Sequence, residues 1–248
     1  MLSSALWGWF AGSSLLLGAA GGYYLKFSKR FISAVMAFGS GVLMSALAFE
    51  LMDESFKKGG YIWSSIGFVV GALLYTFAAI YLNKRGARHR KRSQDIQPTE
   101  TEVHGSGLAI ALGALLDGIP ESIVIGLSLL AGKGPSIATV VAIFISNIPE
   151  GLSSASGMKL AERSPAYIFG LWSAIMFVSG LASLAGFAVF SHLGPEINAG
   201  TIAFAAGAIL AMISTTMIPE AYQEEKEITG IITVFGFLIS FITSKLGS

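Results

Sequence analysis

Residues Leu115 to Gly151 carry a Pro-Glu pair in each of two long apolar segments: Asp117-Gly118-Ile119-Pro120-Glu121-Ser122 and Ser146-Asn147-Ile148-Pro149-Glu150-Gly151. A proline inside a helix leaves the carbonyl four residues earlier without its donor, so each segment exposes backbone oxygen. Asp117 and Glu121 are four residues apart, and Ser146 and Glu150 repeat that spacing. Each pair therefore lies on one helix face. We expect two oxygen-rich faces that can meet.

The depth of these faces follows from the short turn at residues 131–135, which makes the two helices antiparallel. Glu121 and Ser146 each lie nine residues from the shared end of the two segments, and Asp117 and Glu150 each lie thirteen. At about 1.5 Å per residue these pairs lie roughly 14 and 20 Å from the shared surface, near the middle of a hydrocarbon core about 30 Å thick.

The three carboxylates of this stretch have no Lys or Arg in either segment. An unpaired charge at this depth is too costly to persist, so we expect a bound cation or protons to neutralise them. Protonated carboxyls that only hold the helices together through hydrogen bonds are the structural alternative.

The composition predicts an all-α integral membrane protein with a single transmembrane domain over residues 1–248. The 248 residues are 53% hydrophobic and only 12% charged, with a mean hydropathy of +0.69. The absence of cysteine excludes disulfides and thiolate metal ligands. Sixteen basic against fifteen acidic residues provide no electrostatic surface for nucleic acid.

Eight apolar segments are near the length of a spanning helix. They are Ala5 to Leu25, Phe31 to Phe49, Tyr61 to Leu82, Gly107 to Leu130, Ile137 to Met158, Tyr167 to Phe190, Thr201 to Ile218 and Ile228 to Thr243. With both termini outside, twelve of the sixteen Lys and Arg residues fall in inner loops, which fits the positive-inside rule. We expect a multi-pass protein of the cell membrane. Residues 83–105 are polar and aperiodic, which predicts a flexible cytoplasmic loop.

A weak internal repeat relates the second and seventh segments. Gly41 to Phe56 can be laid over Gly207 to Tyr222, which places Glu54 on Glu220. Because the two segments run in opposite directions, the first three and last three helices would be inverted copies around the central pair, as in many transporters. Asp53 and Glu54 would then lie at the outer end of a transport path and Glu220 at the inner end. Chance similarity between two helices rich in small residues is the competing interpretation.

Eight spans with outer termini, a long loop after the third and Pro-Glu motifs in the fourth and fifth together resemble the ZIP (Zrt- and Irt-like protein) family of divalent metal transporters. The resemblance covers nearly the whole chain and implies a 3+2+3 helix arrangement. It also carries that family's metal site onto Asp117, Glu121, Ser146, Asn147 and Glu150.

The chain departs from the family pattern at three places. Asp117 and Ser146 stand where that family has histidines, and Gly118 stands where it often has a ligating Asn. The sixth segment has no acidic residue, so one metal centre is expected instead of two. The resemblance implies uptake of zinc, iron or manganese into the cytoplasm, with the metal as substrate and no other cofactor. Oxygen donors favour the harder ions and the Irving-Williams order favours zinc, so the preferred ion stays open.

Two other functional classes also use buried acidic residues. An intramembrane aspartyl hydrolase needs two facing aspartates, whereas Asp117 is the only Asp deep in a span, so we do not expect an enzyme. A proton-linked carrier of a cationic small molecule is the stronger alternative, because buried acids also serve as proton relays. The expected partners are divalent metal ions and the lipid bilayer, with no nucleic acid, and the choice between monomer and homodimer stays open.

Overall fold

The computed structural model describes residues 2–90, 102–103, 106–131 and 135–246, and the regular secondary structure within them is entirely helical. The α-helices are α1 (Leu2–Tyr24), α2 (Lys29–Ala46), α3 (Met52–Lys84), α4 (Ser106–Ser128), α5 (Ile137–Leu160), α6 (Pro165–Phe190), α7 (Pro195–Met212), α8 (Ile218–Glu225) and α9 (Ile228–Leu246). Two π-helical turns, η1 (Leu47–Leu51) and η4 (Ile213–Met217), extend α2 and α7. Two 3-10 turns, η2 (Ala87–His89) and η3 (Leu129–Ala131), follow α3 and α4.

Six helical stretches of the described chain are long and apolar enough to cross a membrane. The first, Lys29–Lys84, contains a break at Gly60, whose φ of 67° and ψ of −171° are accessible to glycine at little cost. Each of the eight apolar segments predicted from the sequence overlaps a helix. The described part of the chain is therefore all-helical with six candidate membrane spans, and the count of eight remains a prediction.

Local sequence explains where several helices begin. Ser28, Ser136 and Ser164 precede α2, α5 and α6, and each side chain accepts a hydrogen bond from the amide three residues on. These N-caps satisfy amides that have no partner within the helix. Pro120 and Pro149 lie inside α4 and α5, which continue past them.

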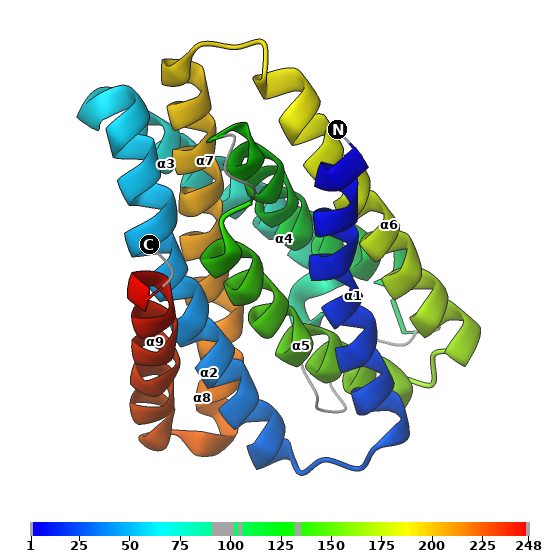
Figure 1. The fold of residues 1–248 in the computed structure, drawn as a ribbon. Coiled ribbons are helices and arrows are strands. Elements are labelled where there is room, and N and C mark those ends of the chain that lie inside the picture. Colours follow the sequence, from blue (N-terminus) through cyan, green and yellow to red (C-terminus); the bar gives the residue numbers. More distant parts are fainter. Residues whose placement is uncertain (1, 91–101, 104–105, 132–134, 247–248) are drawn as a thin grey trace.

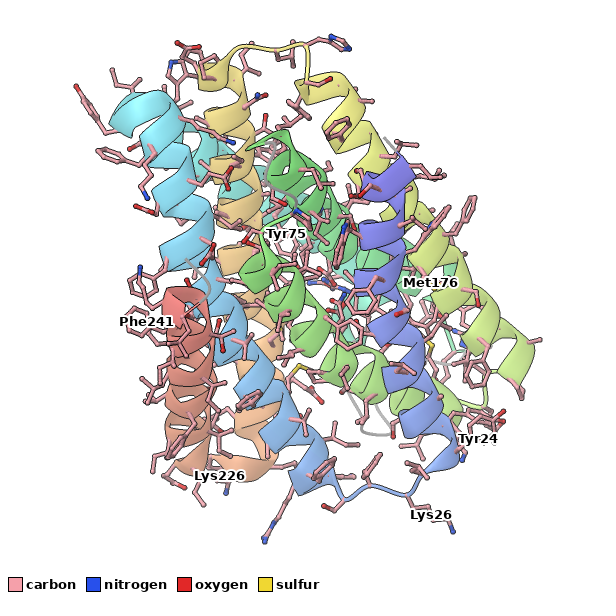
Figure 2. All side chains as sticks on the ribbon, viewed as in Figure 1. Tyr24, Lys26, Tyr75, Met176, Lys226 and Phe241 are labelled. Atoms are coloured by element: carbon pink, nitrogen blue, oxygen red, sulfur yellow. The ribbon has the colours of Figure 1, made fainter. Side chains whose placement is uncertain are left out.

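The helices form two groups with α4 and α5 between them (Figure 1). On one side α1 packs against α5 and α6, and α6 packs against α4; on the other side α3 packs against α7, and α2 against α9. Contacts of α2 with α5 and of α4 with α7 join the groups. Lys26 and Lys226, both predicted to face the cytoplasm, lie at the same end of the bundle (Figure 2).

The helix boundaries repeat along the chain in the register that the sequence repeat predicts. Helices α2 and α7 each have 18 residues, and the π-helical turns that follow each have five. The shift that superposes Gly41 on Gly207 also superposes Lys29 on Pro195 and Ala46 on Met212. The two helices run in opposite directions (Figure 1), as an inverted repeat requires. The match covers residues 29–51 and 195–217, and the inverted repeat of the first three and last three helices stays a prediction.

The packing of the two repeats matches as well. A Cβ on Gly41 would meet the backbone of Thr233 and Phe237 in α9, and a Cβ on Gly207 would meet the backbone of Phe68 and Ala72 in α3. In both cases the four-residue spacing on the partner helix is the same. Helix α2 therefore packs on α9 as α7 packs on α3, through glycines that let the backbones touch.

Substituting these glycines should destabilise the protein. Gly41→Ala or Gly207→Ala would force a methyl group into a neighbouring backbone, which we expect to cost about 1–3 kcal/mol and to lower the melting temperature of the detergent-solubilised protein. Gly230→Ala in α9 is the matched control, because nothing lies within 4 Å of its added Cβ. Equal melting temperatures for all three variants would contradict the packing described.

Candidate functional site

An ion pair in the interior of the bundle holds the first predicted site residue. Arg90 Nε donates to Asp117 Oδ2 at 3.0 Å, and Arg90 Nη2 donates to Asp117 Oδ1 at 3.0 Å. Both residues are only 2% exposed. Two parallel hydrogen bonds between a guanidinium and a carboxylate form the strongest geometry available to such a pair, so Asp117 is firmly held.

Tyr75 completes this cluster. Its hydroxyl donates to Asp117 Oδ1 at 2.7 Å and accepts from Arg90 Nη2 at 3.1 Å. Figure 2 shows Tyr75 inside the bundle, where it is 3% exposed. The cluster thus joins α3, the segment after η2 and α4.

The conformation of the chain after α3 places Arg90 at this position. Gly86 adopts a left-handed conformation with φ of 110°, and the turn η2 follows it. Ala87 is fully buried. Gly113 of α4 leaves room for the arginine, because a Cβ there would lie 2.5 Å from Arg90 Cδ and 2.8 Å from its Nε.

This contact was not predicted. For all three carboxylates we expected a bound cation or protons, whereas Asp117 is neutralised by Arg90, a side chain from outside both segments. Residues 83–90 of the predicted flexible loop are mostly helical, while residues 91–101, 104 and 105 of that loop lie outside the described residues. Arg90 is one of several bases between residues 84 and 92, and nothing in the sequence distinguishes it from its neighbours.

The second pair of predicted ligands lies on α5. Ser146 is 1% exposed and donates to the carbonyl of Ile143 at 2.9 Å. Asn147 is 5% exposed, and its Nδ2 donates to the carbonyl of Ala11 in α1 at 3.3 Å. Each side chain donates to a backbone carbonyl, and its oxygen is the atom that it can offer to a cation.

The two glutamates of the Pro-Glu motifs are also buried. Glu121 is 2% exposed and Glu150 is 4% exposed. Glu121 lies on α4 and Glu150 on α5, and these two helices contact each other in the middle of the bundle (Figure 1). In the part of the chain that the structure describes, no three His, Cys, Asp or Glu side chains are gathered closely enough to hold a metal.

The predicted ends of the path have different surroundings. Asp53 pairs with Lys57 at 2.6 Å and Glu54 pairs with Lys58 at 2.5 Å, each four residues along α3, and all four side chains are at least about a quarter exposed. Glu220, in the first turn of α8, is only 3% exposed. The sequence repeat aligns Glu54 with Glu220, but in the structure Glu54 is partly exposed and paired with Lys58 whereas Glu220 is buried.

Glu50 makes polar contacts that were not predicted. It lies in η1, where it accepts hydrogen bonds from Ser136, the N-cap of α5, and from Ser244 in α9. Glu50 follows Phe49, the predicted end of the second apolar segment, so its sequence position does not indicate a buried contact. Glu50 thus links the π-helical turn η1 by hydrogen bonds to the start of α5 and to α9. Such turns are frequent at functional sites.

Comparison with known proteins adds no assignment: no protein-family profile and no curated protein matches this chain.

Proposed function

We propose that this protein is a transporter of divalent metal cations, similar to the ZIP family, and not an enzyme. It would take zinc, iron or manganese into the cytoplasm through eight spanning helices in a 3+2+3 arrangement with inverted repeats. The observation that carries the proposal is the burial of Glu121 and Glu150 on two adjacent proline-containing helices in the middle of an apolar bundle. Ionisable residues at such depth mark ion pathways far more often than structural contacts.

The chemistry of the surrounding groups supports a hard, oxygen-based site. The oxygen donors on the two faces are the carboxylates of Glu121 and Glu150, the Ser146 hydroxyl and the Asn147 carbonyl. Carboxylate and carbonyl oxygens suit manganese and ferrous iron, while zinc usually takes nitrogen or sulfur as well.

Other parts of the chain fit a path on either side of this site. Glu220, buried near the end predicted to face the cytoplasm, is a suitable inner station. Glu54 and Asp53 would attract cations at the outer surface, with Lys57 and Lys58 as their resting partners. Both termini would face outside the cell membrane.

Reconstitution into liposomes tests the proposal. Purified protein in vesicles loaded with a metal-quenched dye should give saturable uptake of Mn²⁺, Fe²⁺ or Zn²⁺, whereas protein-free vesicles should give only leak. Absence of saturable uptake of all three ions would sink the proposal. A pH-driven flux of an organic cation in such vesicles would instead indicate the proton-linked carrier.

A further inference from the structure

Arg90 is a positive charge built into the region through which a cation would pass. Its guanidinium is bound to both oxygens of Asp117. Asp117 precedes Glu121 by one helical turn on α4, so the ion pair lies next to the proposed site.

This placement is specific. Gly86 turns the chain, Gly113 leaves space for the side chain, and the Tyr75 hydroxyl bonds both members of the pair. A bidentate pair with a third partner leaves Asp117 with little capacity to ligate a metal. Asp117, which the resemblance makes a metal ligand, is thereby assigned a different role.

We propose that Arg90 sets the cation affinity of the transport site: it withholds Asp117 from the ligands and its charge weakens the attraction of the site for cations. The inference rests on the proposed function, since it concerns the same site. A weakened site suits a transporter, because a cation that binds too tightly is not released.

The size of the effect follows from Coulomb's law. A unit charge ~10 Å from a divalent ion, at an effective dielectric constant of about 20, changes affinity by about a hundredfold. Allowing for relaxation of the site, we expect at least about a tenfold change for each unit of charge altered.

Binding of Mn²⁺ to the full, detergent-purified protein, followed by electron paramagnetic resonance, provides the test. Arg90→Gln removes a positive charge and should tighten binding at least about tenfold, while Asp117→Asn removes a negative charge and should weaken it by a similar factor. The double variant R90Q/D117N restores the charge and should return close to the wild-type affinity. Arg90→Lys keeps the charge but loses the bidentate geometry, and should stay within about threefold of wild type.

The outcomes separate the inference from the proposed function. Binding in the wild type that is unaffected by Glu121→Gln would contradict the proposed function. Binding that depends on Glu121 but is equal in R90Q, D117N and the wild type would overturn the role of Arg90 alone. If Lys at position 90 behaved like Gln, the bond geometry and not the charge would matter, which also overturns it. Melting temperatures of the same samples identify variants that fail to fold. If D117N fails to fold, the Mn²⁺ affinities of R90Q and of the double variant still test the role of Arg90.

Discussion

Glu121→Gln and Glu150→Gln should each reduce uptake of Mn²⁺ into proteoliposomes by at least about a hundredfold. Each substitution keeps the size of the side chain and removes one negative charge from a buried position, 2% and 4% exposed respectively. A divalent ion inside an apolar bundle depends on such charges, because its hydration is lost and neutral amides replace little of it. The measurement is the initial rate of dye quenching at equal amounts of reconstituted protein.

Glu196→Gln is the matched control for this experiment. Glu196 lies in the first turn of α7 and is exposed to solvent, so the same chemical change there should leave the rate unchanged. Wild-type rates in either E121Q or E150Q would show that the transport site lies elsewhere in the bundle.

Asp117→Leu should destabilise the fold by about 3–5 kcal/mol, because it leaves the buried guanidinium of Arg90 without the carboxylate that it binds. The change should appear as a large drop in the melting temperature of the purified protein. The double variant R90M/D117L should recover most of the loss, since apolar groups of similar size can replace a buried ion pair at little cost.

Glu54→Leu gives the comparison for a surface pair. The side chains of Glu54 and its partner Lys58 are each about a quarter exposed. Surface ion pairs of this kind contribute about 0–1 kcal/mol to the free energy of unfolding. If D117L were no more destabilising than E54L, the Arg90 to Asp117 contact would not be the buried pair described here.

Some of the site could be predicted from the sequence because it depends on local spacing. The pairs Asp117 with Glu121 and Ser146 with Glu150 are each four residues apart, and a helix puts such residues on one face whatever surrounds it. Long apolar segments on both sides leave these faces no position except the interior, and all four side chains are buried. The repeat was visible for the same reason, since Gly41 and Gly207 belong to similar local patterns.

The partner of Asp117 could not be predicted, because it depends on where one turn of chain folds back. Arg90 belongs to a polar, basic stretch that by composition belongs in water. Its burial needs the left-handed Gly86, the space at Gly113 and the hydroxyl of Tyr75 together, and these residues come from three separate parts of the chain. The hydrogen bonds of Glu50 likewise arise from packing and have no periodic signal in the sequence.

Hydropathy and the helical period act locally, so the sequence alone predicts apolar helices long enough to span a membrane and the residues that share a helix face. How the charges are compensated depends on the tertiary structure. A buried carboxylate takes whichever cation the fold brings within hydrogen-bonding distance, and for Asp117 that cation is a side chain of the protein, Arg90, 27 residues earlier in the chain.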